Sequence, residues 1–413
     1  MHKFLTALRP RALQRIERIG RADLIVGIPC FNNDTTVTHV IQTAGEGLAR
    51  HFKELRCVLI VADGGSTDDS REAAEGAELP PYVEKIVTLY RGLPGKGSAM
   101  RLFFEAMGGL GARGAVVLDS DLRSIRPEWI RSLARPLIED GYDFVAPIYT
   151  RYKYDGTITN NIAYNLCRAL FGRQVRQPIG GDFGFSGRLA IHWAQQPVWE
   201  SDIARFGIDI WMTISAIMEH FKIGQAPLGT KIHDAKDPVT SLGPMFRQVV
   251  GTLFSLIEHY DQRWPPLPSA PVPVLGQSID GEAEAFPVDL PRMIHNYKEG
   301  FEHFNTFWRE ILDPATFEAL ARVAGASEEE FHLTTEEWAK VVYEFAATFH
   351  RWSRDRSRLV DLMCPIYYAR VASFMKRTAK MTTPEAETVV EEQAEVFERL
   401  RGHLVERWAA TSG

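Results

Sequence analysis

Residues Ala115–Asp121 read Ala-Val-Val-Leu-Asp-Ser-Asp, and the rest of the chain can be arranged around them. The four apolar residues predict a buried strand, and two aspartates follow where that strand ends. Side chains at positions i and i+2 of an extended chain point the same way, so Asp119 and Asp121 can face one cation together. Carboxylate oxygens suit Mg²⁺ or Mn²⁺, which often also hold substrate phosphates. The alternative for so short a motif is a solvated turn with two surface acids.

The composition indicates a globular protein of two domains. The chain has 413 residues, 45% of them hydrophobic and 24% charged, and one ordinary core seldom extends over such a length. A formal net charge of −6 gives no electrostatic case for nucleic acid as a partner. The four cysteines lack the spacing of a metal site, and no apolar run is long enough for a membrane span. We therefore expect a cytoplasmic protein with reduced thiols.

Strands and helices alternate through the first part of the chain. Apolar runs predict strands, and periodic patterns predict helices between them, at residues 23–29, 35–49, 58–63, 85–90, 98–108 and 115–118. This alternation predicts an α/β fold, in which helices sandwich a Rossmann-like, mainly parallel sheet. Ligands of such sheets bind beyond the carboxyl ends of the strands. The polar loops expected at that edge are 29–34, 63–68, 95–97 and 119–121.

Gly95-Lys96-Gly97 stands directly before a predicted helix. It is not a P-loop, because the upstream glycine spacing and the Ser/Thr after the lysine are absent. Helix N-termini attract anions, so Lys96 between two glycines could reach a diphosphate. A flexible surface turn is the other interpretation.

The order of these motifs resembles that of nucleotide-sugar glycosyltransferases with the GT-A fold. The motifs are Pro-x-x-Asn after the first strand, then Asp-x-Gly-Ser-Thr-Asp, Gly-Lys-Gly and Asp-x-Asp. Further on, Gln177–Asp182 is similar to the Gln-Pro-Leu-Gly-Gly-Glu segment of retaining mannosylglycerate synthases and glucosyl-3-phosphoglycerate synthases. Phe206–Ile210 resembles their Gly-x-x-acid segment, and Lys231–His233 their Arg/Lys-x-His segment. The resemblance extends from about Asp23 to about Tyr260.

One position departs from this pattern. Gly64 stands where many GT-A sequences have a second aspartate, whereas the residues on both sides of it match. The matching residues on both sides still predict nucleotide binding at this turn.

The resemblance implies roles on the donor side. A nucleotide sugar, GDP-mannose or UDP-glucose, would be bound by residues from the four loops and the Gln177 segment. These residues are Pro29, Phe31, Asn33, Asp63, Ser66, Lys96, Ser120 and Ile179. Lys96 would contact the diphosphate. Asp119, Asp121 and His233 would surround Mg²⁺ or Mn²⁺. Of the two aspartates, Asp121 is the one expected to bind the ion directly.

The resemblance also implies that Asp209 lies on the acceptor side, against the transferred sugar. Asp209, Asp121 and Lys96 would then form the catalytic set. Taken alone, His233 is more often a structural histidine, and Asp209 could be a capping or salt-bridge residue. The neighbours of Asp209 are apolar, and such surroundings favour a perturbed pKa.

Residues 149–160 are expected to bind the acceptor. Arg151 stands among hydroxyl and amide donors that suit a small carboxylate or phosphate, although an ordinary basic surface loop is the plainer interpretation. Glucosyl-3-phosphoglycerate synthases have Gly-Arg-x-Thr here, and this chain has Gly-Thr-Ile-Thr instead, so the phosphate-holding arginine is missing. Arg151 resembles the arginine that precedes this stretch in mannosylglycerate synthase. We therefore expect unphosphorylated glycerate to bind at Arg151, Thr157, Thr159 and Asp209.

The last part of the chain has a different character. Residues 263–288 are rich in proline and indicate a linker or a long wrapping loop between a catalytic domain, 1–262, and a helical domain, 289–413. Helical patterns dominate the latter, and Thr334 and Thr382 are good N-terminal signals. Four tryptophans suggest packing between helices, and we expect a homodimer.

The resemblance thus predicts a metal-dependent retaining hexosyltransferase that forms mannosylglycerate, glucosylglycerate or a phosphorylated relative. One rival is an inverting GT-A enzyme acting on a lipid or polysaccharide, with Asp209 as general base. It would call for a membrane tether, which we do not find in the sequence. A nucleotidyltransferase would need a glycine-rich loop with a basic residue after the first strand, where Pro-Cys-Phe-Asn stands. A non-catalytic binding module is disfavoured because donor, metal and acid positions are all occupied.

Overall fold

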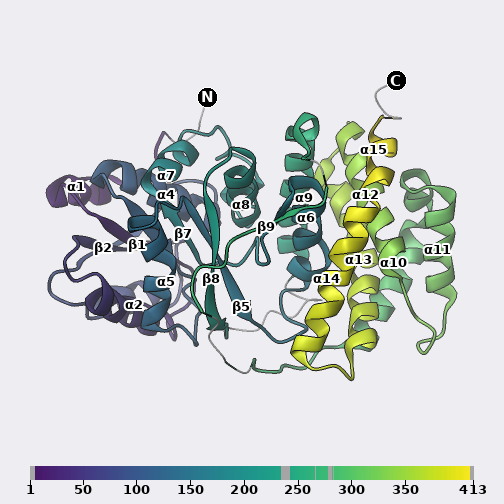
Figure 1. The fold of residues 1–413 in the computed structure, drawn as a ribbon, viewed down its shortest axis with the longest axis horizontal. Coiled ribbons are helices and arrows are strands. Elements are labelled where there is room, and N and C mark those ends of the chain that lie inside the picture. Colours follow the sequence, from purple (N-terminus) through teal and green to yellow (C-terminus); the bar gives the residue numbers. More distant parts are fainter. Residues whose placement is uncertain (1–4, 234–241, 266, 278–280, 282, 410–413) are drawn as a thin grey trace. The chain divides into compact units, whose positions relative to one another are not determined.

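The structure is a computed structural model that describes residues 5–233, 242–265, 267–277, 281 and 283–409 (Figure 1). The chain forms two compact units, each assembled from three stretches. The sheet unit comprises Met1–Thr150, Val175–Asp234 and Val272–Glu284, and the helical unit comprises Arg151–Gln174, Ala235–Pro271 and Ala285–Gly413. The two units are therefore interleaved along the chain, whereas the boundaries expected at residues 262 and 288 treat the domains as consecutive.

The sheet unit contains a seven-stranded sheet in the order β3-β2-β1-β4-β7-β5-β8. The strands are β1 (Leu24–Cys30), β2 (Cys57–Asp63), β3 (Glu84–Leu89), β4 (Gly114–Val117), β5 (Phe144–Thr150), β7 (Phe183–Ser186) and β8 (Ile223–Thr230). β7 runs antiparallel to β4 and β5, and the pairs β1–β2, β1–β4, β2–β3 and β5–β8 are parallel. The predicted mixed, mainly parallel sheet is confirmed.

Helices cover both faces of this sheet, as Figure 1 shows. On one face α2 (Val37–His51) packs against α5 (Pro127–Ile138), and on the other α4 (Lys96–Leu110) packs against α7 (Gly187–Ala194). The unit also contains α1 (Pro10–Ile19), α3 (Ser70–Gly76) and α8 (Ile208–Met218). β1, β2 and β4 are buried because their sequences are nearly continuous apolar runs, which is typical of strands covered on both sides.

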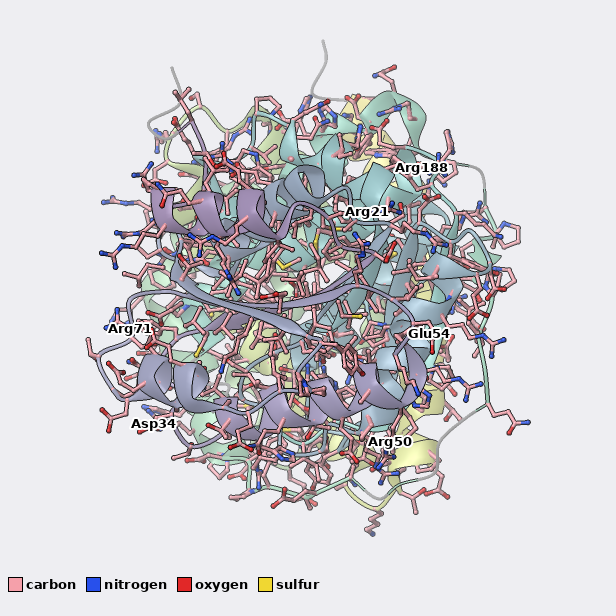
Figure 2. All side chains as sticks on the ribbon, turned by 90° about the vertical axis from the view of Figure 1, so that its left-hand side faces the viewer. Arg21, Asp34, Arg50, Glu54, Arg71 and Arg188 are labelled. Atoms are coloured by element: carbon pink, nitrogen blue, oxygen red, sulfur yellow. The ribbon has the colours of Figure 1, made fainter. Side chains whose placement is uncertain are left out.

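The two ends of the parallel strands can be followed in Figure 2. Asp34 and Arg71, which come after β1 and β2, lie on one side of the view, and Arg21 and Glu54, which precede these strands, lie on the other. The loops after β1 and β2 therefore share the carboxyl edge of the sheet, where the sequence analysis expected the ligand.

The helical unit consists mainly of long helices. They are α6 (Tyr164–Phe171), α9 (Leu242–His259), α10 (Leu290–Ile311), α11 (Pro314–Gly325), α12 (Thr335–Arg351), α13 (Arg356–Thr378), α14 (Thr383–Arg399) and α15 (Arg401–Ala409). A π-helix at Thr159–Ala163 precedes α6, and β6 (Arg173–Gln174) pairs with β9 (Ala270–Pro271). The helical C-terminal region is confirmed.

Local signals explain where two of these helices begin. Thr334 and Thr382 each form a capping box, with Glu337 and Glu385 respectively, so the predicted N-terminal signals of α12 and α14 are confirmed. Trp308 and Trp338 are fully buried inside the helical unit. Their packing is therefore accounted for within one chain, and the homodimer stays a prediction.

The proline-rich stretch does more than connect the units. The Gln225 backbone donates to the Pro273 carbonyl at 2.9 Å and accepts from the Leu275 N–H at 2.7 Å, so part of the stretch extends the sheet beside β8. In the part of the chain that the structure describes, no helix combines the length and apolar character needed to cross a membrane.

Candidate active site

The loops that follow β1, β2 and β4 are joined to one another by hydrogen bonds. The last residues of β1 and β2, Cys30 and Asp63, are paired in the register of the sheet. The Asn32 N–H donates to Ser66 Oγ at 2.9 Å, and Ser120 Oγ donates to Asn33 Oδ1 at 2.7 Å. The predicted donor residues Asn33, Ser66 and Ser120 thus lie together, and Pro29 is the next-to-last residue of β1.

Asp63 shapes the turn after β2. Its buried carboxylate accepts from the backbone N–H of Gly65 at 3.2 Å and of Ser66 at 3.1 Å, and from Ser66 Oγ at 2.6 Å. Gly65 has a φ of +90°, which favours glycine at this position. The Phe31 ring beside this turn is 58% exposed, so the edge offers an apolar surface next to hydrogen-bonding groups.

The structure also explains the departure at Gly64. A Cβ at this position would lie 3.1 Å from the Tyr90 hydroxyl and 3.3 Å from the Phe31 ring. The Tyr90 hydroxyl is itself held by the Gly95 N–H at 3.0 Å. The space that an aspartate would need is therefore filled by Tyr90 and Phe31.

Lys96 lies in a partly buried cluster of charges at the carboxyl edge. Its Nζ donates to Asp119 Oδ1 at 2.8 Å and to the Gly181 carbonyl at 2.8 Å, and it lies 3.4 Å from Asp209 Oδ2. Burial alone would lower the pKa of Lys96, but the charges of Asp119 and Asp209 outweigh it, and the pKa lies above its usual value. Lys96 therefore keeps a positive charge in this cluster.

A second lysine occupies the other side of Asp119. Lys231 Nζ donates to Asp119 Oδ2 at 2.9 Å, to Asp182 Oδ2 at 2.7 Å and to the Gly180 carbonyl at 2.9 Å. Burial would raise the pKa of Asp119, yet Lys231 and Lys96 together hold it well below its usual value. Both oxygens of Asp119 thus face ammonium groups. Ile179, a predicted donor residue, precedes the glycines whose carbonyls hold these lysines.

Asp209 lies in the first turn of α8 and is buried. Its Oδ2 faces Lys96, and its Oδ1 has no hydrogen-bond partner among the described residues. Burial raises the pKa of Asp209, and Lys96 offsets only part of that rise. Thr213, one turn further along α8, donates to the Pro178 carbonyl at 2.7 Å, which fixes this helix against the Gln177 segment. Asp209 thus has one carboxylate oxygen available for a hydroxyl.

Asp121 and His233 are brought together by a short backbone pairing. Leu122 and His233 form an antiparallel bridge, and the Arg123 N–H donates to the Ile232 carbonyl at 2.9 Å. Both Asp121 and His233 are partly exposed at this edge. An aspartate oxygen and an imidazole nitrogen are donors that Mg²⁺ or Mn²⁺ accepts.

The predicted acceptor residues Arg151, Thr157 and Thr159 belong to the helical unit, unlike Asp209. Arg151 Nη1 lies 3.4 Å from Asp155 Oδ2, and the Thr157 hydroxyl shares a 2.5 Å hydrogen bond with the Tyr367 hydroxyl. Thr157 and Thr159 are both buried, and Thr159 opens the π-helix. The Thr157 hydroxyl is therefore engaged in the packing of its own unit.

Two residues of the charge cluster received no role in the sequence analysis, Lys231 and Asp182. The available signal was their place in the Arg/Lys-x-His and Gln-Pro-Leu-Gly-Gly-Glu segments. Their partners depend on the antiparallel placement of β7 and on the β5–β8 pairing, which no local pattern indicates.

The glycines of Gly95-Lys96-Gly97 allow two backbones to meet. α4 begins at Lys96, the Gly97 N–H donates to the Arg205 carbonyl at 3.0 Å, and a Cβ at Gly97 would overlap the Ile203 carbonyl oxygen. Because Gly97 is buried in this contact, the segment is not a flexible surface turn. It ties Lys96 to the loop that leads into Asp209.

We expect Gly97→Ala to destabilise the protein by about 2 kcal/mol or more, because backbone atoms cannot yield as a side chain can. Gly108→Ala, in the same helix, is the matched control: a Cβ there meets nothing within 4 Å, so the change should be neutral or stabilise by up to about 1 kcal/mol. Chemical denaturation of both variants measures the difference. Equal stabilities would contradict the close approach at Gly97.

Residues 25–189 match the family model described as glycosyl transferase family 2. The matched region is well under half of the chain, and it contains the donor loops, Lys96, Asp119 and Asp121. This part of the protein is a glycosyltransferase domain, and its fold is of the GT-A type.

Solved structures of glucosyl-3-phosphoglycerate synthase from Mycobacterium tuberculosis are similar to this chain. The complex with phosphoglyceric acid is 26% identical, with a TM-score of 0.45, over 61% of this chain and 86% of that one. The complex with Mn²⁺, uridine diphosphate and glucosyl-3-phosphoglycerate is 25% identical, with a TM-score of 0.45, over 62% and 86%. No curated protein matches the chain.

Proposed function

We propose that this glycosyltransferase is metal-dependent and retaining, and that it moves glucose or mannose from a nucleoside diphosphate to glycerate or a close relative. The observation that carries the proposal is the partly buried Lys96 ammonium between Asp119 and Asp209, at the edge of the sheet where the loops after β1, β2 and β4 meet. A fixed positive charge at that place suits a departing diphosphate.

The nucleoside end of UDP-glucose or GDP-mannose would lie over the loops after β1 and β2. The exposed Phe31 ring can pack against a base, and Asn33, Asp63, Ser66 and Ser120 supply polar groups around it. The diphosphate would then extend towards Lys96.

Asp121 and His233 would hold a divalent cation in this proposal, because the Leu122–His233 bridge joins the backbone segments that carry them and both side chains offer a suitable donor atom. When bound, Mg²⁺ or Mn²⁺ would supply Lewis-acid stabilisation of the diphosphate leaving group. The two oxygens of Asp119 face Lys96 and Lys231, so Asp119 would hold these lysines in place rather than bind the cation itself.

The residues around the sugar have separate tasks in this proposal. Lys96 stabilises charge that develops on the leaving phosphate, and Asp209 Oδ1 accepts a hydrogen bond from a sugar hydroxyl. The Gln177–Gly181 backbone lies beside both, because its glycine carbonyls accept from the two lysines. In a retaining reaction the leaving phosphate takes the proton of the attacking acceptor hydroxyl.

An inverting reaction is the second candidate, and one observation favours it. Asp209 Oδ1 has no hydrogen-bond partner in the described part of the chain, and burial raises the pKa of Asp209, as expected of a general base for the acceptor hydroxyl. Proton NMR of the freshly formed glycoside distinguishes the two. The proposal predicts the anomeric configuration of the donor, and the opposite configuration would assign Asp209 the role of base.

Arg151→Ala is expected to lower turnover with glycerate by about tenfold or more, because a charged hydrogen bond to the acceptor carboxylate is worth about 1.5–3 kcal/mol. Donor affinity, measured by calorimetry without acceptor, should not change. Lys153→Ala is the matched control, since the Lys153 ammonium donates to the Thr378 and Met381 carbonyls, both at 2.7 Å, within the helical unit. It should lower stability and leave the acceptor KM unchanged. Equal weakening of donor and acceptor by Arg151→Ala would mean that this loop has another task.

A further inference from the structure

We propose that Asp313, Glu344 and His403 form a metal site of their own inside the helical unit and that this site binds Zn²⁺. The three residues are far apart in the sequence, but all of them belong to that one compact unit. The inference goes beyond the proposed function and does not depend on it, because none of these residues belongs to the sheet unit.

The donor atoms of the three side chains face one another. His403 Nε2 lies 2.7 Å from Glu344 Oε1 and 3.9 Å from Asp313 Oδ2, and all three donor atoms lie within 4.8 Å of one another. A zinc ion holds nitrogen and oxygen ligands at about 2.0–2.2 Å, which places the ligand atoms about 3–3.5 Å apart. Small movements of the side chains would therefore bring all three atoms to one ion.

Three different helices hold these side chains in place. Asp313 is the N-cap of α11, and its Oδ1 accepts from the Thr316 N–H at 2.9 Å. Glu344 lies in the middle of α12, and His403 lies in the first turn of α15. Glu344 Oε2 accepts from the Asp313 N–H at 2.8 Å, which fixes the start of α11 against α12. The site is thus built on rigid elements, which position ligands more precisely than loops do.

The charges of this cluster favour a cation. Glu344 is 0% exposed, and the side chains of Asp313 and His403 are 24% and 19% exposed. Two carboxylates this close repel each other unless a proton or a cation lies between them. Among the described residues, only His403 forms an ion pair with either carboxylate. Zn²⁺ with a neutral imidazole would balance both carboxylates, and the partial exposure of Asp313 and His403 gives an ion access from solvent.

Another histidine–carboxylate pair in the same unit shows the purely structural arrangement. His350 Nδ1 lies 3.0 Å from Glu258 Oε1, and Arg356 donates to both oxygens of Glu258, at 2.7 and 3.1 Å. The Arg356 guanidinium neutralises that single carboxylate. The cluster at Asp313 differs from this pair because it contains two carboxylates and, within the described part of the chain, no guanidinium paired with them.

The ligand types point to Zn²⁺ rather than Mg²⁺. Imidazole nitrogen suits Zn²⁺, whereas Mg²⁺ prefers oxygen ligands and keeps several waters. Three protein ligands and one water would complete a tetrahedral zinc site. Because the ligands come from three helices, a bound ion would hold α15 to α11 and α12 and so stabilise the C-terminal end of the helical unit.

Calorimetric titration of the full-length protein with Zn²⁺, together with its thermal midpoint, tests the proposal. The wild-type protein should bind Zn²⁺ in the presence of excess Mg²⁺, and its thermal midpoint should rise by several degrees. Two variants remove a ligand and keep the hydrogen bonds of the cluster: His403→Gln can still donate to Glu344, and Asp313→Asn can still cap α11. Each should weaken Zn²⁺ binding by about tenfold or more and abolish the rise.

Two control variants should keep the wild-type response to Zn²⁺. They are His350→Gln, in the structural pair, and Asp121→Ala, at the metal site proposed in the sheet unit. Wild-type Zn²⁺ affinity in folded His403→Gln or in folded Asp313→Asn would overturn the inference and would mean that a shared proton holds the cluster together. A wild-type protein that binds no Zn²⁺, or Zn²⁺ binding that is lost in Asp121→Ala, would also overturn it, while the proposed function stands.

Discussion

Replacing Asp121 by alanine is expected to lower kcat/KM by about a hundredfold or more, because the lost Lewis acid, worth about 3 kcal/mol, is not replaced by water. Asp121 precedes Leu122, whose backbone is bridged to His233, whereas the Asp119 carboxylate is engaged by two lysines. A chelator should abolish activity of the wild-type protein, and Mn²⁺ or Mg²⁺ should restore it. Initial rates over a series of metal concentrations measure the effect.

His233→Ala serves as the companion variant. If His233 binds the metal, this change should raise the metal concentration needed for half-maximal activity and leave the thermal midpoint of the metal-free protein nearly unchanged. A large loss of metal-free stability with normal metal dependence would show that His233 is a structural residue. Near-normal turnover of Asp121→Ala would refute the metal assignment itself.

Replacing Lys96 by methionine should have the second-largest effect, a fall in kcat of about a hundredfold. The Lys96 ammonium is the positive charge that this account places at the leaving diphosphate, and methionine keeps the length of the side chain without the charge. Lys96→Arg should restore little of the lost kcat. Lys96 Nζ faces three acceptors in different directions, on Asp119, Asp209 and the Gly181 carbonyl. A planar guanidinium does not match that arrangement.

Lys85→Met is the matched control for this prediction. Lys85 donates to the carbonyls of Ala74 at 3.0 Å and Glu75 at 2.7 Å, at the end of α3, so its loss should cost stability without changing kcat. Steady-state rates with saturating donor and metal measure both variants. A Lys96→Met protein that turns over at the wild-type rate would remove Lys96 from the reaction.

The local sequence was sufficient for the first half of the sheet. Continuous apolar runs predicted β1, β2 and β4, and the polar residues after them predicted the edge where Asp63, Lys96, Asp119 and Asp121 lie. Such features depend on neighbouring residues, since burial of a strand and the carboxyl-edge rule for parallel sheets act over short stretches.

The remaining features depend on pairings between distant parts of the chain. Phe183–Ser186 is too short to reveal its direction, so the approach of Asp182 to the Asp119 backbone could not be foreseen. The sequence predicted that Thr157 binds the acceptor, but its hydroxyl shares a hydrogen bond with the hydroxyl of Tyr367 in α13. The interleaving of the two units arises in the same way, because α6 packs against α14, and α9 against α12 and α13, much later in the chain.

The measurement that tests the central claim most directly is release of nucleoside diphosphate from UDP-glucose and from GDP-mannose, each with glycerate or 3-phosphoglycerate. The account predicts that one donor is consumed, that release requires both Mn²⁺ or Mg²⁺ and the small hydroxy acid, and that Asp121→Ala abolishes it. Metal-independent release, or transfer to a lipid acceptor while every small hydroxy acid is ignored, would contradict it.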